Sequence, residues 1–172
     1  MERKTANQTE AVLTEIVLPN DTNVLGNLMG GRLLHWMDIA AAISSYRHSK
    51  RTVVTASVNN VSFNKPIPLG SIVTLKAKIS RAFTSSMEVF IDVWFEDKKE
   101  KGKKQKCNEA IYTFVAVDQE GNSIEVPEII PESKEEKERF EGALRRRQLS
   151  LILAGRLEAS KASELKALFL KQ

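Results

Sequence analysis

Residues 30–43, with the sequence GGRLLHWMDIAAAI, decide the fold that we expect for this chain. The segment is typical of a helix, and Asp38 lies inside it. The residues one helical turn from Asp38 are small or mostly apolar, namely Leu34, His35, Ala41 and Ala42. A carboxylate without a partner on such a face would cost on the order of several kcal/mol. Because proteins tolerate that cost mostly where chemistry requires the group, Asp38 is the first candidate functional residue.

The predicted helix begins at the glycine pair 30–31 and ends at Tyr46 or His48. Its middle, residues 40–42, consists of three alanines. Small side chains let another backbone approach closely, which favours a sheet that wraps around this helix.

Strands are expected on both sides of the helix. Residues 12–18 predict a first strand that stops at Pro19, followed by a segment, 20–27, rich in side chains that hydrogen-bond nearby backbone in turns. After the helix, apolar residues alternate with polar ones and predict four more strands near residues 54–63, 73–79, 87–95 and 110–117. A slip in the alternation at Asn59-Asn60 suggests a β-bulge there.

The connections predict how these strands pair. The lysine-rich stretch 97–106 is expected to be a solvated connection, and residues 110–117 are apolar on both faces, which predicts a central strand. Short connections between four strands favour an antiparallel sheet. One helix lying against a curved antiparallel sheet is an α+β arrangement.

The last part of the chain changes to helical composition after Pro131. Ser133 and Glu136 have the spacing of a capping box, a short apolar run at 149–153 breaks at Gly155, and a final amphipathic helix is expected at the end. We therefore divide the chain into a domain at residues 8–131 and a C-terminal helical extension at 132–172. Residues 145–147, three arginines, would suit a nucleic-acid patch, but a solvated or salt-bridged helix face is the favoured interpretation.

Composition leaves several classes of partner open and makes others improbable. The chain has 172 residues, of which 42% are apolar, and a net charge of +4 from scattered basic residues. That charge would suit a phosphorylated ligand as well as nucleic acid. The single Cys107 excludes an intramolecular disulfide, and one cysteine with two histidines makes a structural zinc site improbable. No apolar leader follows the N-terminus and no stretch approaches membrane-spanning length, so we expect an intracellular, cytoplasmic, soluble protein without membrane insertion.

Six short fragments carry a resemblance to a known family. The order of elements and the Gly-Gly helix start resemble the hotdog fold, in which a sheet wraps a long central helix. The fragments look like those of the cytosolic acyl-CoA hydrolase family of thioesterases, and the resemblance runs from about Ile16 to Asp118. They are PNDTN at 19–23, GNLMGG at 26–31, WMD at 36–38, VTASV at 54–58, FNKPI at 63–67 and TSSMEV at 84–89. Met29 departs from the pattern, because many relatives carry a histidine or a phenylalanine there.

The resemblance implies an acyl-CoA thioesterase that hydrolyses fatty acyl-CoA to free fatty acid and CoA, without a metal and with CoA present only as part of substrate and product. Asn23 and Asp38 match the family's catalytic pair. Asp38 would act as general base on water or as a nucleophile, and Asn23 would orient the water or the thioester. The backbone amides of Gly30 and Gly31 would hold the thioester oxygen, because unpaired N–H groups at a helix start form an anion site.

Helix geometry adds an expectation about assembly. Asp38 lies seven residues beyond Gly31, roughly 10 Å along a helix. One thioester carbon cannot easily reach both, so the site should combine Gly30, Gly31 and Asn23 of one subunit with Asp38 of another. A two-fold dimer is then the minimum unit, and the family suggests a trimer of dimers, a hexamer.

Residues that flank the matched fragments are the candidates for binding the CoA moiety. Lys65, Arg81 and Arg32 are candidates for the phosphates, and Thr84, Ser85 and Ser86 are candidates for the pantetheine channel.

Each site residue has a plainer interpretation. Asp38 would then be a structural carboxylate bonded to Ser45, Ser57 or a backbone amide, and Asn23 would cap a turn. The glycine pair would serve close packing. His35 and Asp38 would suit a His–Asp pair, although a core or interface histidine is favoured. Cys107 shows no nucleophile context.

Two other functions remain as alternatives. A hydroxyacyl-CoA dehydratase or hydratase could use the same fold, but the spacing of His35 and Asp38 fits poorly. A non-catalytic acyl-CoA-binding sensor would need an output module, and the roughly 15 residues before the first matched strand are too few for a DNA-binding helix pair. The basic C-terminal helices are the remaining candidate for such a module, which a salt-dependent shift of DNA would indicate. We expect no nucleic-acid partner.

Overall fold

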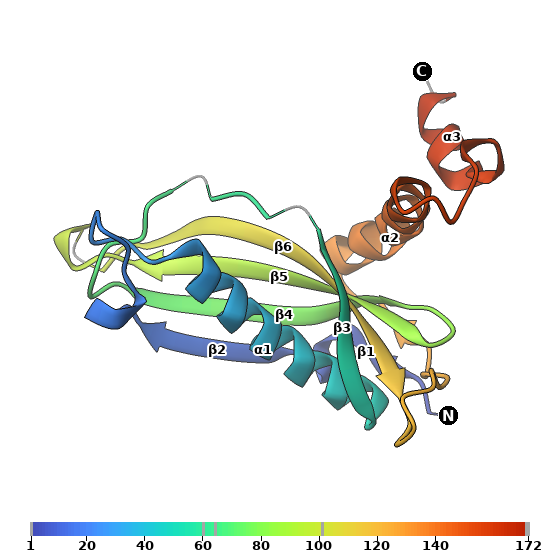
Figure 1. Cartoon of the computed structure of the whole chain (residues 1–172), viewed down its shortest axis with the longest axis horizontal. Coiled ribbons are helices and arrows are strands. Elements are labelled where there is room, and N and C mark those ends of the chain that lie inside the picture. The colour runs from blue at the N-terminus through green and yellow to red at the C-terminus, as the bar shows by residue number, and fades with distance from the viewer. Residues whose placement is uncertain (1, 60, 64, 101, 171–172) are drawn as a thin grey trace. The chain divides into compact units, whose positions relative to one another are not determined.

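The computed structural model describes residues 2–59, 61–63, 65–100 and 102–170. The chain divides into two compact units, Met1–Ile130 and Pro131–Gln172. The first unit contains the strands and the helix α1, Gly30–Ser49 (Figure 1). Its elements are β1 (Lys4–Thr5), the 3-10 helix η1 (Ala6–Thr9), β2 (Ala11–Ile16), η2 (Pro19–Asp21), α1 (Gly30–Ser49), β3 (Thr52–Asn59), β4 (Ile72–Ala82), β5 (Ser86–Glu96), η3 (Lys98–Glu100), β6 (Lys104–Val117) and β7 (Ile129–Ile130).

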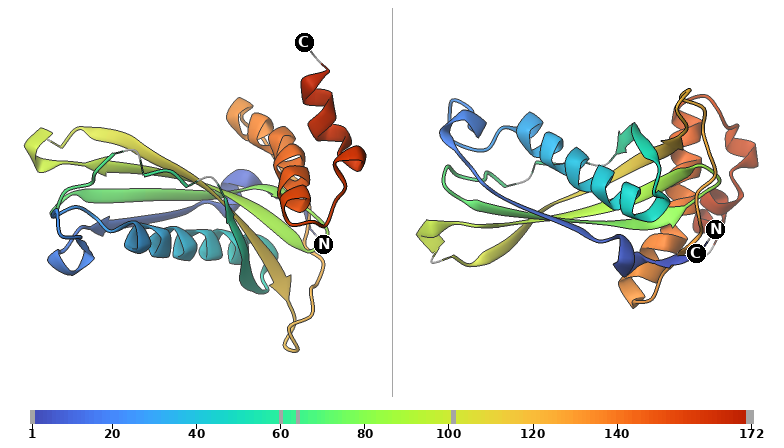
Figure 2. Two further views of the ribbon diagram at one scale, coloured as in Figure 1. Left: turned by 45° about the horizontal axis from the view of Figure 1, so that its top comes forward. Right: turned by 90° about the horizontal axis from the view of Figure 1, so that it is seen from below.

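Five of the strands form one antiparallel sheet in the order β2-β4-β5-β6-β3. The sheet curves around α1, which lies along its concave face in all three ribbon views (Figures 1 and 2). β1 and β7 form a separate parallel pair. The predicted α+β arrangement, a long central helix wrapped by a curved antiparallel sheet as in the hotdog fold, is confirmed.

The core lies between α1 and the inner face of the sheet. Alternate residues of β4 and β5 that were expected to share a face are almost fully buried, and so are Met37, Ala40 and Ala41 of α1. The small side chains of α1 therefore let the sheet approach the helix closely, as the sequence predicted. The buried residues of the two strands are Val73, Leu75, Ala77 and Ile79 in β4, and Met87, Val89, Ile91, Val93 and Phe95 in β5.

The strands differ from the sequence-based prediction in three details. The register shift in β3 lies between Thr55 and Ser57 rather than at Asn59-Asn60; the strand ends at Asn59, and Asn60 falls outside the described residues. β6 begins at Lys104, so the end of the lysine-rich stretch is strand rather than connection. β6 is an internal strand, as its apolar pattern indicated, but β5 occupies the middle of the sheet.

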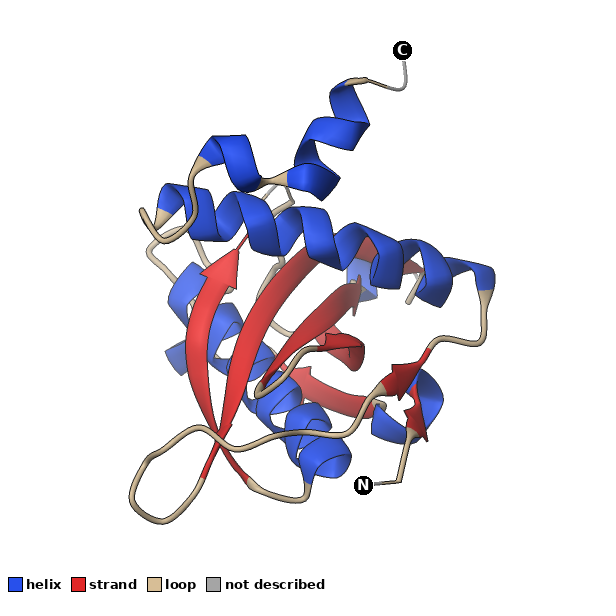
Figure 3. Cartoon of the chain, turned by 90° about the vertical axis from the view of Figure 1, so that its right-hand side faces the viewer, coloured by secondary structure: helices blue, strands red, loops and turns tan. Residues whose placement is uncertain are grey.

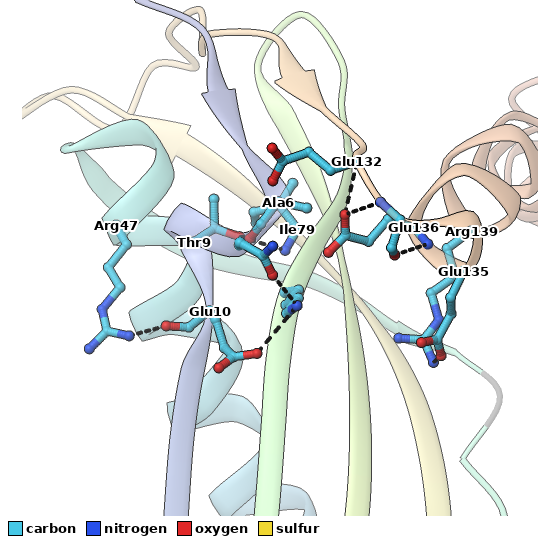
Figure 4. Close-up of polar contacts among 12 residues, drawn as sticks. Ala6, Thr9, Glu10, Arg47, Ile79, Glu132, Glu135, Glu136 and Arg139 are labelled. Atoms are coloured by element: carbon cyan, nitrogen blue, oxygen red, sulfur yellow. Dashed lines mark hydrogen bonds and ion pairs between the residues drawn. The ribbon is translucent and has the colours of Figure 1, made fainter.

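The N-terminal segment is tied to the sheet and to α1 by polar contacts (Figure 4). The Thr9 hydroxyl donates to the Ala6 carbonyl at 2.7 Å and accepts from the backbone N–H of Ile79 at 3.1 Å. Arg47 donates to the carbonyl of Glu10, whose carboxylate pairs with Lys78 at 3.3 Å. These contacts hold η1 against β4 and the end of α1.

The second unit is helical and consists of α2 (Lys134–Leu153), η4 (Ala159–Lys161) and α3 (Ser163–Phe169) (Figure 3). The predicted capping box is present, because Ser133 Oγ accepts from the N–H of Glu136 at 3.1 Å and the Glu136 carboxylate accepts from the N–H of Ser133. The apolar run 149–153 continues α2 rather than forming a separate element. Arg139 pairs with Glu135 at 2.5 Å, and Arg146 donates to the Arg139 carbonyl.

Within the described ranges, no helix is both long and apolar enough to span a bilayer.

Candidate active site

The start of α1 offers unpaired backbone donors. The helix begins at Gly30 after Met29, which provides no side-chain cap, and the amides of Gly30 and Gly31 have no hydrogen-bond partner among the described residues. These N–H groups lie at the positive end of the helix dipole. The helix start is therefore a potential receptor for a developing negative charge.

A buried aspartate fixes the loop that leads into this helix. Asp21 is 6% exposed, accepts from the N–H of Leu18 at 3.0 Å, and pairs with Arg32 at 2.8 Å. Its carbonyl accepts from the N–H of Met29 at 2.8 Å. This role was not predicted from the sequence, although Asp21 belongs to one of the matched fragments. Arg32, proposed as a phosphate ligand, is engaged by this carboxylate.

Asn23 occupies a turn in the same loop. Its Oδ1 accepts from the N–H groups of Leu25 and Asn27 at 2.9 and 3.2 Å. The turn-capping interpretation is therefore correct for the oxygen. The Nδ2 group has no partner in the described part of the chain and the side chain is exposed, so a donor remains for a ligand.

A cavity of about 370 Å³ opens at the start of α1. Its walls come from the loop before the helix and from the segment after β3, which are joined by a 2.8 Å bond from the N–H of Leu28 to the carbonyl of Ile67. The cavity brings together three predicted site residues, Asn23, Gly30 and Lys65. The other lining residues are Asn27, Leu28, Leu33, Phe63, Pro66, Ile67 and Asn108.

The two glycines at the helix start have different surroundings. A Cβ atom added at Gly30 would lie 3.2 Å from the Phe63 ring, whereas one at Gly31 would meet nothing within 4 Å. Close packing therefore explains Gly30 but not Gly31. The side of the helix at Gly31 is open.

Asp38 is half-buried and does not line this cavity. Its Oδ1 accepts a 2.7 Å hydrogen bond from the hydroxyl of Thr55 on β3, and its Oδ2 has no partner within the described ranges. Neither Ser45, Ser57 nor a backbone amide holds it. The role of Thr55 was not predicted from the sequence, although the residue lies in the matched fragment VTASV.

Tyr112 lies close enough to Asp38 for the carboxylate charge to affect its pKa. Burial, and then the negative charge of Asp38, raise the pKa of Tyr112 to about 12. Its hydroxyl therefore stays protonated, and it donates to the Leu34 carbonyl at 3.1 Å.

His35 and Cys107 show no catalytic arrangement. His35 is exposed, and the hydrogen bond that Asp38 Oδ1 accepts comes from the Thr55 hydroxyl rather than from His35. Cys107 is buried, its Sγ–H donates to the Val93 carbonyl at 3.4 Å, and burial raises the pKa of its thiol to about 11. A neutral, buried thiol is a poor nucleophile.

The remaining predicted CoA ligands lie at the opposite end of the sheet. Thr84 and Ser85 belong to the β4–β5 turn, where their carbonyls accept from the N–H groups of Val126 and Ala116. β5 spans 11 residues, roughly 35 Å, between Ser86 and the sheet end near the cavity. One chain therefore does not bring Arg81, Thr84, Ser85 and Ser86 to the start of α1, and their role stays a prediction.

No group of three or more His, Cys, Asp or Glu side chains within the described residues is arranged to hold a metal ion.

Known proteins are similar to this chain in sequence and in fold. A family model described as Thioesterase superfamily matches residues 25–101. The uncharacterized acyl-CoA thioester hydrolase YkhA of Bacillus subtilis is 38% identical over 135 residues, covering 78% of this chain and 78% of that protein. The chain belongs to the acyl-CoA thioesterase family. Acyl-coenzyme A thioesterase 11 of Mus musculus is 40% identical over 148 residues, covering 86% of this chain but 25% of that protein, so the chain spans about a quarter of this thioesterase.

Solved thioesterase structures match over nearly the whole chain. An apo-hexameric acyl-CoA thioesterase has a TM-score of 0.85 and 31% identity, with 90% of this chain and 98% of that chain covered. The acyl-CoA hydrolase of Staphylococcus aureus in complex with butyryl coenzyme A, coenzyme A and coenzyme A disulfide has a TM-score of 0.81 and 33% identity, with 99% and 100% covered. Structures of that hydrolase with one asparagine, one aspartate or one threonine changed to alanine also match. In its sequence the asparagine lies 15 positions before the aspartate, and the threonine lies 17 positions after it.

Proposed function

We propose that this protein is a thioesterase that hydrolyses fatty acyl-CoA to a free fatty acid and CoA. One observation carries the proposal: Asn23, Asp38 and Thr55 have the same residue types, order and spacing as the three residues changed to alanine in the Staphylococcus aureus acyl-CoA hydrolase. That hydrolase binds butyryl-CoA and CoA. The hydrogen bond from Thr55 to Asp38 supports a joint role for these residues here.

The chemistry follows from which atoms are free. Thr55 occupies Oδ1 of Asp38, so Oδ2 is available to take a proton from water as the water oxygen attacks the thioester carbon. The alternative step is attack by Oδ2 itself, which forms an acyl-aspartate anhydride that water then hydrolyses. In either case the C–S bond breaks and the CoA thiolate leaves and is protonated. The amides at Gly30 and Gly31 stabilise the negative charge that develops on the carbonyl oxygen, and Asn23 Nδ2 orients the substrate.

The complete site requires two subunits in this proposal. The cavity that contains Asn23 and Gly30 does not include Asp38, which lies roughly 10 Å along α1 from Gly31. A second copy related by a two-fold axis would place its helix start against the Asp38 of the first copy. The helix start of the first copy would then lie against the Asp38 of the second. Each dimer would then hold two equivalent sites.

The surface around Asp38 suits such a partner. β3, which carries Thr55, is an edge strand of the sheet, and its side chains Val54 and Val58 are 46% and 44% exposed. On α1, Ile39 and Ile43 are also exposed, at 37% and 39%. An apolar edge strand beside an apolar helix face is a surface that soluble proteins usually cover. The hexameric state of the apo thioesterase above supports a trimer of such dimers.

Metal independence, the absence of a cofactor and a cytoplasmic location belong to the same proposal. No step above draws on a metal or a cofactor. Thiol release should therefore survive dialysis against EDTA.

The function is tested by measuring free thiol release from acyl-CoAs of increasing chain length. Asp38→Ala should lose at least about 10²-fold in rate while keeping its fold and oligomeric state, because a general base contributes that much or more. Asp118→Ala, in an exposed turn at the far end of β6, is the matched control and should release thiol close to the wild-type rate. Wild-type protein that binds acyl-CoAs without releasing thiol would overturn the function. Undiminished turnover by Asp38→Ala would keep the function and overturn the mechanism.

A further inference from the structure

Asn108 is a buried polar residue in an otherwise apolar row. It shares the inner face of β6 with Ala110, Tyr112 and Phe114, and it is 5% exposed. A register shift between Val93 and Trp94 of the neighbouring strand lies beside it. Bulges of this kind re-aim side chains and are common next to binding sites.

The orientation of the Asn108 amide is fixed by its surroundings. Its Nδ2 donates to the carbonyl oxygen of Ser62, and because a carbonyl can only accept, the amide group cannot be reversed. Its Oδ1 is buried and has no hydrogen-bond partner among the described residues. Buried acceptors are rarely left in this state unless a ligand or a water supplies the donor.

Asn108 lines the same cavity as Gly30, Asn23 and Phe63. The wall of the cavity therefore contains a residue with a buried, unsatisfied acceptor. A fatty acyl chain has no N–H or O–H group to offer. The pantetheine arm of CoA has two amides, and the one nearer the sulfur is separated from it by two methylene groups.

We propose that Oδ1 of Asn108 accepts a hydrogen bond from the N–H of the pantetheine amide nearest the sulfur. This inference rests on the proposed function and assigns this cavity to the CoA side of the thioester rather than to the acyl chain. The bond sets the distance between the pantetheine amide and the start of α1. The thioester carbon is separated from that amide nitrogen by two carbons and a sulfur, so its oxygen reaches the amides of Gly30 and Gly31. The apolar wall of Leu28, Leu33 and Phe63 covers the methylene groups between them. Asn108 is thus a residue that positions the substrate rather than one that reacts.

A pair of small substrates isolates this hydrogen bond. One is the acyl thioester of N-acetylcysteamine, and the other is the acyl thioester of 2-acetoxyethanethiol, in which an oxygen replaces the amide N–H. The acyl group is the one that the wild-type protein hydrolyses best as acyl-CoA. The wild-type protein should show a kcat/KM about five to ten times higher for the amide substrate, the usual worth of one hydrogen bond.

Asn108→Leu should abolish this preference and bring the amide-to-ester ratio of kcat/KM close to one. Thr113→Val, a polar-to-apolar change on the opposite face of the same strand, is the matched control and should keep the wild-type ratio. Asn108→Ala is measured in the same way in case the leucine variant does not fold.

The outcomes separate this inference from the proposed function. If Asn108 served only to hold Ser62, both substrates would slow by the same factor and the ratio would not change, which would overturn the inference. A wild-type ratio of one would overturn it as well. Failure of the wild-type protein to release thiol from any acyl-CoA would instead overturn the proposed function, and the inference with it.

Discussion

Thr55 links the candidate base to the edge of the sheet. Its hydroxyl is the only group within the described residues that bonds the Asp38 carboxylate. Thr55→Val keeps the shape of the side chain and removes this charge-assisted bond. We expect kcat to fall by about 10- to 100-fold with little change in KM, because such bonds contribute roughly 1.5–3 kcal/mol. Steady-state kinetics measure the separate effects on kcat and KM.

Ser57→Ala, two residues along β3, is the control for Thr55→Val, because its hydroxyl does not contact Asp38. An unchanged kcat in Thr55→Val would show that Asp38 does not depend on this bond.

His48 predicts how stability depends on pH. The ring is fully buried, and Nε2 donates to the Pro127 carbonyl at 2.7 Å. Burial, together with the nearby Lys4, lowers the pKa of His48 below its ordinary value of 6.5. Below about pH 6.5 the unfolded chain therefore binds a proton at His48 that the folded chain does not bind. The contribution of His48 to folding stability is constant above this pH and falls as the pH drops below it.

Thermal melts from about pH 7.5 to pH 5 should show this loss, and the slope should be smaller in His48→Gln, which cannot take up the proton. Equal slopes in the two proteins would mean that other groups carry the pH dependence.

Among the elements, the start of α1 allows a matched pair of changes. The Cβ atom added by Gly31→Ala has no neighbouring side chain within 4 Å, whereas the Cβ atom added by Gly30→Ala lies 3.2 Å from the Phe63 ring. Gly31→Ala should therefore keep or slightly raise the melting temperature, since alanine favours helix by up to about 1 kcal/mol. Gly30→Ala should lower it.

Activity separates the two roles of this helix start. If the open side at Gly31 receives the thioester, Gly31→Ala should lose thiol release despite its stability. A stable and fully active Gly31→Ala protein would contradict the use of this helix start as the oxyanion site.

The elements themselves were largely predictable from the sequence. Alternating apolar residues located β4 and β5, the Gly-Gly pair marked the start of α1, and the spacing of Ser133 and Glu136 marked the start of α2. The bulge in β3 was misplaced because it depends on the pairing with β6, which the β3 sequence does not contain. The beginning of β6 was not predicted because its lysines suggested a solvated connection. Lys104 and Lys106 instead lie opposite Glu96 and Trp94 of β5 on the outer face of the sheet, where charged side chains are compatible with a strand.

At the scale of the whole molecule, the site was predictable only in part. Asn23, Gly30 and Lys65 converge on one cavity, as their place in the matched fragments suggested. The roles of Thr55, Asp21 and Asn108 depend on partners far along the chain, which local patterns do not reveal. Arg81 and residues 84–86 lie at the other end of the sheet. They are close to a matched fragment in sequence, but β4, a strand of 11 residues, separates them from the cavity in space.

The most direct measurement of the central claim is complementation between two inactive variants. Asn23→Ala and Asp38→Ala are purified with different tags, dissociated, mixed and reassociated, and the hybrids are verified by capture on both tags. A shared site predicts that each hybrid dimer contains one intact site and one doubly altered site. Since half of randomly formed dimers are hybrids, the mixture should recover about a quarter of the wild-type rate of thiol release. Asp38→Ala mixed with a differently tagged copy of itself should recover nothing. Verified hybrids without activity would contradict a site built from the Asp38 of one subunit and the Asn23 and α1 start of another.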